Sequence, residues 1–131
     1  ILMLVYVAGA LSNSDKDTNR TPSKVVVDYI NNCRKMLIAA REVIRKGHAP
    51  FVPALDFLTG LVSGDMEEKD YRLCNLEFLS VCDVMLVLSR SSGVREEIEF
   101  AKKKGIPVCY KIEDLPSKAP GKAVGWKWGI R

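Results

Sequence analysis

Short apolar runs alternate with helical patterns along this chain. The first run covers residues 2–8, residues 84–88 and 106–110 form two more, and residues 48–53 make a shorter one between prolines. A continuous apolar run of this length is typical of a strand that is buried on both faces of a sheet. The pattern therefore predicts four strands in one sheet.

Three helical patterns separate these strands. The first begins at Thr21 and Pro22, a cap followed by a first-turn proline, and ends at Gly47. Its apolar positions recur at the spacing of one helical face: Val26, Ile30, Cys33, Leu37, Ala40 and Ile44. The second helix covers residues 67–81, with these residues on one side: Tyr71, Cys74, Phe78 and Val81. Leu73, Leu76 and Leu79 widen that apolar face. The third runs from the turn at residues 91–93 to Lys104.

Two stretches are less regular. Residues 9–20 form a polar, turn-rich loop, and residues 55–65 form either a short helix or a lid. Residues 111–131 are rich in Pro, Gly and Lys and contain Trp126 and Trp128. We expect this tail to be loosely ordered or to pack on another subunit.

The alternation of strands and helices predicts a single α/β domain over residues 1–131, with its core at about 1–110. Right-handed crossovers would make a doubly wound parallel sheet, Rossmann-like or flavodoxin-like, with helices on both faces. Ligands of such sheets bind beyond the carboxyl ends of the strands. Gly9, Pro53 and the turn at residues 91–93 are expected to meet there.

The composition is globular, with 47% apolar and 27% charged residues among 131 and a net charge of +4. It excludes a disordered or fibrous chain. The mild positive charge suits a small anionic ligand but is not the clustered basic patch of a nucleic-acid-binding protein. Because no apolar run approaches the roughly 20 residues of a membrane span, and the opening residues lack a basic leader, we expect no membrane partner and no signal peptide.

Metal and histidine chemistry have little support in the sequence. The cysteines are scattered without a C-x-x-C pair, at Cys33, Cys74, Cys82 and Cys109. We expect them to be reduced in a cytoplasmic protein that has no metal site and needs no cofactor. His48 is the only histidine and has no nucleophile near it in sequence, which argues against a Ser-His-Asp or Cys-His mechanism.

The strongest functional signal is the turn Ser91-Ser92-Gly93, which joins an apolar strand to a helix. The N–H groups of a helix N-terminus favour an anion, and small residues let that anion approach closely. Ordinary helix capping by serine explains the same residues equally well. Glu97 lies about one turn into the helix, where its carboxylate can reach the same cleft.

Four motifs resemble those of the nucleoside 2-deoxyribosyltransferase superfamily. Residues 6–9 (Tyr-Val-Ala-Gly) are similar to its first motif, and residues 75–83 to a second that ends in Cys/Ala-Asp. Residues 91–97 resemble its Ser/Asp-x-Gly-x-x-x-Glu motif, and residues 105–108 its Gly-x-Pro-Val strand. The likeness spans roughly residues 3–110 and rests on the order and spacing of the motifs.

The resemblance implies that Glu97 is a nucleophile. It would attack C1′ of a nucleoside or nucleotide and expel the base, and water or a second base would resolve the glycosyl-enzyme ester. Tyr6 would orient the carboxylate. Ser91 stands where the 2′-deoxynucleoside 5′-phosphate N-hydrolases of this superfamily have serine, so Ser91, Ser92 and Gly93, with Gly9, would bind a 5′-phosphate or the 5′ end of the substrate. Family members assemble as dimers or larger, which implies a homo-oligomer.

One position departs from that pattern. Asn75 stands where the superfamily has an Asp that contacts the base and can protonate it. An amide can contact a base but cannot donate a proton to it. The acid is then supplied by Asp56, Asp65 or Asp70, or the base leaves unassisted, or activity is absent.

The sequence therefore predicts cleavage of the N-glycosidic bond of a (deoxy)nucleoside 5′-monophosphate, by hydrolysis or deoxyribosyl transfer, with Glu97, Tyr6 and Asn75 at the reacting centre. The alternative is an inactive nucleotide-sensing module of the same fold. A structural scaffold is a third possibility, which the converging glycine and serine turns disfavour. The base, the sugar and the acceptor stay open.

Overall fold

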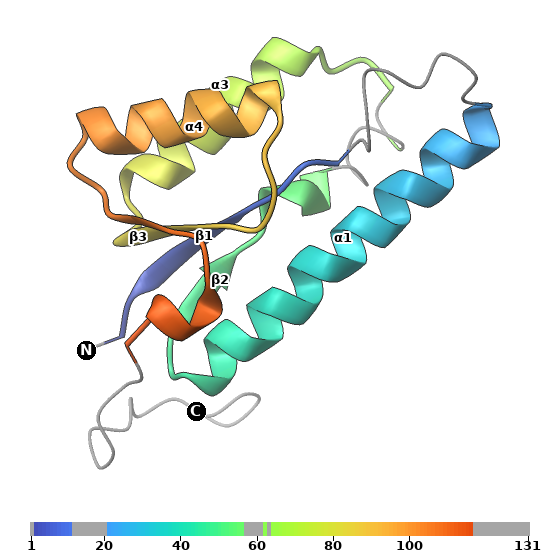
Figure 1. The fold of residues 1–131 in the computed structure, drawn as a ribbon. Coiled ribbons are helices and arrows are strands. Elements are labelled where there is room, and N and C mark those ends of the chain that lie inside the picture. Colours follow the sequence, from blue (N-terminus) through green and yellow to red (C-terminus); the bar gives the residue numbers. More distant parts are fainter. Residues whose placement is uncertain (1, 12–20, 57–61, 63, 117–131) are drawn as a thin grey trace.

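A four-stranded parallel sheet forms the centre of the computed structural model, which describes residues 2–11, 21–56, 62 and 64–116 (Figure 1). The strands are β1 (Leu4–Ala8), β2 (Ala49–Phe51), β3 (Val84–Val87) and β4 (Val108–Cys109). They lie in the order β2-β1-β3-β4. In this register Tyr6 of β1 pairs with Phe51 on one side and Met85 on the other. The four predicted strands are confirmed, although β2 and β4 are shorter than their apolar runs.

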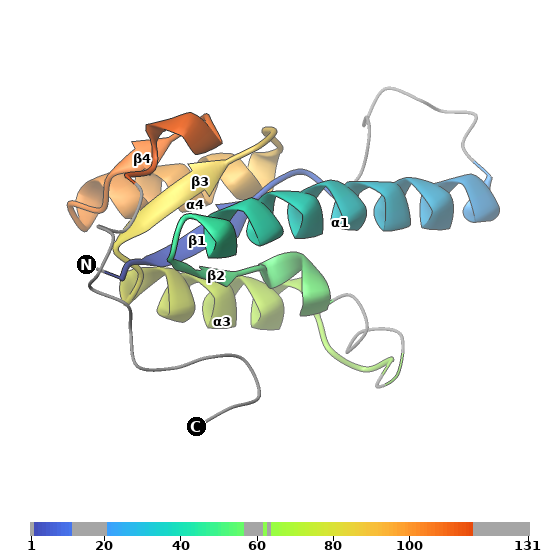
Figure 2. The ribbon, with the colours of Figure 1, turned by 90° about the horizontal axis from the view of Figure 1, so that it is seen from below.

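Helices cover both faces of the sheet. The helix α1 (Pro22–Arg45) lies on one face, and α3 (Glu68–Ser80) and α4 (Ser92–Lys103) lie on the other (Figures 1 and 2). Two short 3-10 helices, η1 (Pro53–Leu55) and η2 (Ile112–Asp114), follow β2 and β4. The predicted α/β class, one parallel sheet flanked by helices, is confirmed.

Alternate residues of the two central strands build two separate hydrophobic layers, as the period of a strand requires. Val5 and Val7 of β1 and Leu86 of β3 face α1, where they pack on Met36 and Val43. On the other face, Tyr6, Ala8, Met85 and Val87 pack against α3 and α4 through these residues: Leu79, Val94, Ile98 and Ala101. Tyr6 is completely buried in this second layer.

The apolar face that the spacing marks on α1 is not the face that packs on the sheet. Ala40 is buried as part of that face, but Ile30 and Leu37 are 53% and 45% exposed. The residues that α1 buries are Asp28, Asn32, Met36, Ala40 and Val43. The first turns of α1 extend past the sheet (Figure 2), and the buried Asn32 side chain donates from Nδ2 to the Leu11 carbonyl oxygen. Only the later turns of α1 need an apolar face toward β1 and β3.

The face predicted for the second helix is only partly the buried one. Leu79, from its widened part, is completely buried, but Cys74, Phe78 and the C-cap residue Val81 are exposed. Tyr71 and Asn75 precede Leu79 by eight and four residues and lie on its side of the helix. The inner face of α3 is therefore polar toward its start and apolar toward its end.

Side chains fix the amino edge of the sheet, where β1 and β3 begin. The Leu4 N–H donates to Asp83 Oδ2 at 2.7 Å, and the Met3 N–H donates to His48 Nδ1 at 3.1 Å. His48 is buried and its other ring nitrogen, Nε2, bonds to the Pro116 carbonyl oxygen. Both residues are thus structural, as expected for Asp83, and they lie at the edge opposite the predicted site.

Candidate functional site

The carboxyl edge has a switch point between β1 and β3. The chain leaves β1 toward α1 on one face and leaves β3 toward α4 on the other (Figure 1). Such a point is the usual ligand crevice of an open parallel sheet. Here the Ala10 N–H donates to Ser89 Oγ at 2.8 Å and joins the two loops. A Cβ on Gly9 would lie 3.2 Å from Met36 Sδ, so glycine lets α1 come close to this edge.

The predicted anion cradle is the N-terminus of α4. Ser91 is its N-cap, and its Oγ accepts a hydrogen bond from the Val94 N–H at 3.2 Å. Ser92 and Gly93 form the first turn, which holds no acidic residue. A Cβ on Gly93 would meet only Ser91 Oγ, at 3.9 Å, so the space beside this turn is open. Capping by Ser91 is therefore present, together with room for a ligand.

Glu97 and Tyr6 are neighbours in the layer between the sheet and α4. Burial raises the pKa of Glu97 above its usual value, while the Tyr6 hydroxyl lowers that pKa and Glu96 raises it. Burial also raises the pKa of Tyr6, and the negative charge of Glu97 adds to the increase. The two side chains are close enough for a hydrogen bond between them to shift both pKa values. Among the described residues, however, neither Tyr6 Oη nor Glu97 Oε2 has a hydrogen-bond partner of normal distance and angle.

Two more unsatisfied atoms lie in the same layer. Tyr71 Oη and Asn75 Oδ1 are buried and have no hydrogen-bond partner among the described residues. Both residues are on the inner face of α3, which packs against α4, and Arg72 and Glu96 form an ion pair between the two helices. An unsatisfied buried polar atom costs about 1–3 kcal/mol, and native structures contain few. These four atoms are therefore the candidate contacts for a polar ligand in this layer.

The structure separates the three carboxylates proposed as the acid. Asp70 Oδ2 accepts the Glu67 N–H at 3.0 Å at the start of α3, and Asp65 is exposed. Asp56 directly follows η1 at the carboxyl end of β2 and is partly buried. Burial raises the pKa of Asp56, and its charge contributes to the raised pKa of Tyr6. Of the three, Asp56 is the one that follows a strand at the carboxyl edge of the sheet.

A cavity of about 330 Å³ opens at the same edge but on the α1 face. Its lining comes from the two loops and from α1: Ala10, Asn32, Lys35, Met36, Leu88, Ser89 and Arg90. We call it the cationic pocket, because Lys35 and Arg90 line it and its described lining holds no carboxylate. From the sequence alone, Arg90 is a solvated charge with only a weak case for contact with a phosphate, and Lys35 carries no signal.

Several expectations fall on residues that the structure does not describe. These are Lys16 and Arg20, two cations with a weak case for contact with a phosphate, and the tail residues Trp126 and Trp128. Most of residues 55–65, expected to form a short helix or a lid, also lie outside the described residues. All four cysteines are free. In the described ranges, no group of three or more His, Cys, Asp or Glu side chains is placed to hold a metal ion. The sequence put Tyr71 on one side of a helix but gave no sign that it belongs to the candidate site. That its hydroxyl lacks a partner among the described residues is visible only in the structure.

None of the helices in the described part of the chain has both the length and the apolar character needed to cross a membrane. No curated protein matches the chain. One family model does match, over residues 4–111, and it is described as a domain of unknown function, DUF7768. The match covers all four strands and the three helices of the sheet's two faces. The chain therefore belongs to the DUF7768 family.

Proposed function

We propose that this protein cleaves the N-glycosidic bond of a (deoxy)nucleoside 5′-monophosphate, with Glu97 as the nucleophile. The observation that supports this most is the set of four unsatisfied buried atoms, on Tyr6, Tyr71, Asn75 and Glu97. A sugar ring and a base bring hydroxyl, ring-nitrogen and carbonyl groups, which are the partners that these atoms lack. The resemblance to the nucleoside 2-deoxyribosyltransferases adds the reaction type.

The chemistry needs a carboxylate beneath C1′ as positive charge develops there. Glu97 attacks C1′ while the bond from C1′ to the base nitrogen breaks, and the electron pair of that bond leaves with the base. Tyr6 is placed beside this carboxylate, where its hydroxyl can donate to the oxygen that does not attack. Water or a second base then attacks C1′ and releases the ester. Burial favours this step, because a desolvated carboxylate interacts strongly with the developing cation.

The departing base takes a proton, and Asn75 cannot supply it. We assign this role to Asp56. Burial raises the pKa of Asp56, which is the direction that a general acid requires. Asp56 also follows η1, in the segment that leaves the carboxyl end of β2. Asn75 keeps a contact role, since its amide can donate to and accept from the edge of a base.

The test is release of free base from a panel of ribo- and deoxynucleoside 5′-monophosphates, followed by chromatography. Glu97→Gln should reduce release by at least about 10³-fold, because the nucleophile is lost. The matched control is Glu99→Gln, an exposed carboxylate on the same helix that should leave the rate unchanged. Equal loss in both variants, or no release by the wild-type protein from any substrate, would contradict the proposal.

A second candidate is a nucleotide sensor of the same fold, and Asn75 in place of an acid is the observation that favours it. It predicts binding of a nucleotide with no base release. Calorimetric titration of the same panel distinguishes the two candidates. Binding that is tight, and release that is absent for every bound nucleotide, would favour the sensor.

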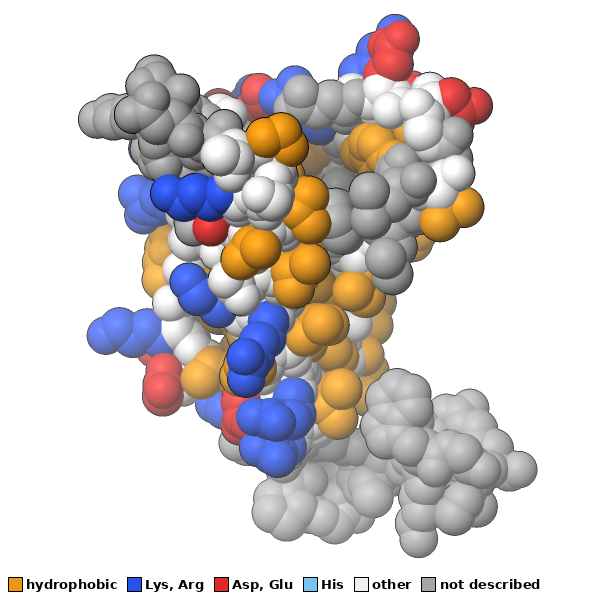
Figure 3. Space-filling view, turned by 90° about the vertical axis from the view of Figure 1, so that its right-hand side faces the viewer, with side chains coloured by type: hydrophobic (Ala, Val, Ile, Leu, Met, Phe, Trp, Pro, Cys, Tyr) orange, Lys and Arg blue, Asp and Glu red, His pale blue; other side chains and the backbone are white. Residues whose placement is uncertain are grey.

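The protein is also proposed to be a homo-oligomer in a reducing, cytoplasmic compartment. Six large apolar side chains are exposed along α1: Val26, Val27, Ile30, Leu37, Ile38 and Ile44. Figure 3 shows hydrophobic side chains gathered on one face, with Lys and Arg beside them. A patch of this kind supports burial against a second copy. The four free cysteines support the compartment.

A further inference from the structure

The cationic pocket lies on the opposite face of the sheet from Glu97. Its helix wall is α1, which packs on Val5 and Val7, whereas Glu97 lies in the layer of Tyr6. The proposed attack on C1′ uses none of its residues. We propose that the cationic pocket is a phosphate-binding site, formed by Lys35, Arg90 and Ser89. This inference does not depend on catalysis by Glu97.

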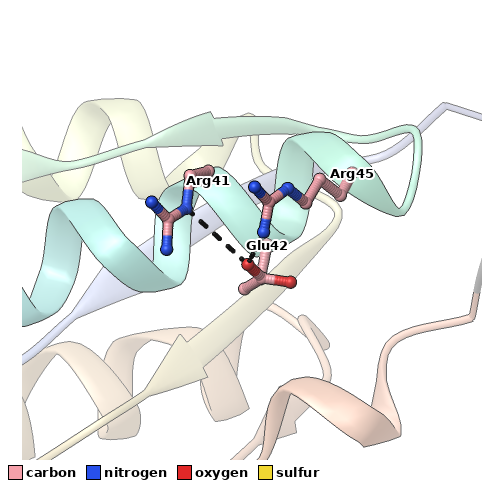
Figure 4. A network of polar contacts seen from close by, with 3 residues as sticks. All are labelled: Arg41, Glu42 and Arg45. Carbon is pink, nitrogen blue, oxygen red and sulfur yellow. Dashed lines mark hydrogen bonds and ion pairs between the residues drawn. The ribbon is translucent and has the colours of Figure 1, made fainter.

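The charges of the pocket are uncompensated. Lys35 and Arg90 both line the cavity, and none of the described residues that line it is an Asp or Glu. By contrast, Arg41 and Arg45 of the same helix share one carboxylate, since Glu42 Oε1 lies 2.5 Å from Arg45 Nη1 and 3.7 Å from Arg41 Nε (Figure 4). Two unpaired cations facing one cavity attract an anion with two charges.

The donors are held in place before any ligand arrives. The guanidinium of Arg90 lies over the ring of Tyr110, 5.1 Å from its centre, which restricts the side chain by a cation–π contact. Ser89 Oγ accepts the Ala10 N–H, so its own hydroxyl hydrogen can be donated to an anion. Asn32 Nδ2 donates to the Leu11 carbonyl oxygen at 2.7 Å and fixes the loop beside the cavity.

The chemistry of these groups favours phosphate over a carboxylate. A guanidinium presents several N–H donors in a plane, and an ammonium and a hydroxyl add donors from other directions. A phosphate group has three or four acceptor oxygens and up to two negative charges at neutral pH, so it can use all of them. The cavity is at the lower end of the volumes of small-molecule sites, about 300–1,000 Å³. It therefore has room for a phosphate that carries a substituent.

The test is direct binding by the whole chain, measured by calorimetry with inorganic phosphate, pyrophosphate and deoxyadenosine 5′-monophosphate. Lys35→Met and Arg90→Met should each weaken phosphate binding about tenfold or more, because each removes a charge-assisted contact. Arg90→Lys keeps the charge but loses the planar donors, and should lie between Arg90→Met and the wild type. Arg41→Met is the matched control, an α1 cation that is already paired with Glu42.

The phosphate in the pocket could belong to a nucleotide or to a separate phosphate ligand, and the two cases give different results. If the nucleotide displaces inorganic phosphate, and both are weakened by Lys35→Met, the pocket receives the phosphate of a nucleotide. If the nucleotide binds without displacing phosphate, the pocket takes a separate phosphate ligand. Either result supports the site. It is refuted if inorganic phosphate and pyrophosphate do not bind, or if Lys35→Met and Arg90→Met bind them as tightly as Arg41→Met does. Lys35, Arg41 and Arg90 are all exposed, so the four variants should fold, and circular dichroism checks this.

Discussion

Glu97 is the side chain where stability and the proposed activity conflict most clearly. Its carboxylate is largely buried, it sits beside another buried polar group, and one of its oxygens has no partner. Burying a charge without full pairing is unfavourable. The proposed reaction needs such a carboxylate, because it becomes paired only when positive charge forms at C1′. This conflict can be measured.

Glu97→Gln should therefore stabilise the fold at neutral pH while it abolishes base release. The pKa of Glu97 is raised on folding, so the folded state binds a proton more tightly than the unfolded state. Its contribution to stability is then fully present below the unfolded pKa and is lost as the pH rises through the higher, folded pKa. Urea unfolding at several pH values measures this.

The advantage of Glu97→Gln over the wild type should grow from acid to neutral pH. The exposed Glu99→Gln should show no such trend. A Glu97→Gln variant that is less stable than the wild type at neutral pH would mean that the carboxylate is well paired in solution, against the account given above.

Asp56→Asn should lower base release by about 10²–10⁴-fold with ordinary nucleotides, the range for loss of a general acid. It should lower release much less with 2′-deoxy-7-methylguanosine 5′-monophosphate, because that base is already cationic and leaves without a proton. Comparing the two substrates separates a proton donor from a residue that only shapes the site.

Two carboxylates serve as controls for Asp56. Asp65→Asn removes an exposed charge and should change nothing, and Asp70→Asn should affect only the start of α3. Equal losses on both substrates would refute the role of Asp56 as the acid. If Glu97→Gln still abolished release, the proposed function would stand without that role.

At the scale of single residues, the sequence could single out Glu97 and Ser91 as candidates, because each has a place in a motif, and their roles stay predictions. It could not choose among the three candidate acids, since burial and helix capping are visible only in the structure. It gave no signal for Lys35, whose proposed role depends on how α1 lies against the loops.

Among the elements, α1 shows that hydrophobic periodicity can predict a helix without predicting which of its faces is buried. The helix and both of its ends are close to the prediction, because Thr21, Pro22 and Gly47 are strong local signals. The buried face is not the predicted one, since α1 has apolar residues on more than one side. Which side faces the sheet is decided by packing on β1 and β3 and not by the helix itself.

Two helix caps offer a matched comparison. Ser91 caps α4 and Thr21 caps α1, and each accepts an N–H at 3.2 Å. Ser91→Ala and Thr21→Ala should each cost about 1 kcal/mol of stability. Both costs should appear as a shift of roughly 3–5 °C in the midpoint of thermal unfolding.

Only Ser91→Ala should also weaken nucleotide binding, because its hydroxyl lies at the proposed anion cradle. Calorimetric titration of the two variants with one nucleoside 5′-monophosphate gives the answer. If both variants lose affinity equally, Ser91 acts through stability alone and the cradle is only a cap.

For the whole molecule, the class of fold followed from the order of elements. Apolar runs separated by helical patterns leave few alternatives to a parallel sheet with helices on both faces. The assembly state does not follow in the same way, because the sequence cannot show which apolar residues are left uncovered. The structure shows them on α1 and on the outer face of α3.

Introducing a charge on α1 should dissociate the proposed oligomer. Ile30→Asp and Leu37→Asp each place a carboxylate among the exposed apolar side chains of α1, where burial against a second copy would be costly. Light scattering coupled to size-exclusion chromatography measures the mass. Leu73→Asp, at a 64% exposed leucine on α3, is the control. Dissociation by Leu73→Asp alone would move the interface to α3.

The open edges of the sheet bear on how such copies can meet. On β2, the Ala49 N–H donates to the Met3 carbonyl oxygen, so the next nitrogen, that of Pro50, points to the outer edge. Proline has no hydrogen to donate there. The other edge strand, β4, has two residues and follows Pro107. A foreign strand therefore finds little to pair with at either edge, which protects concentrated solutions from the growth of fibrils by strand addition. We therefore expect the native chain to self-associate through its helices and not through its strand edges.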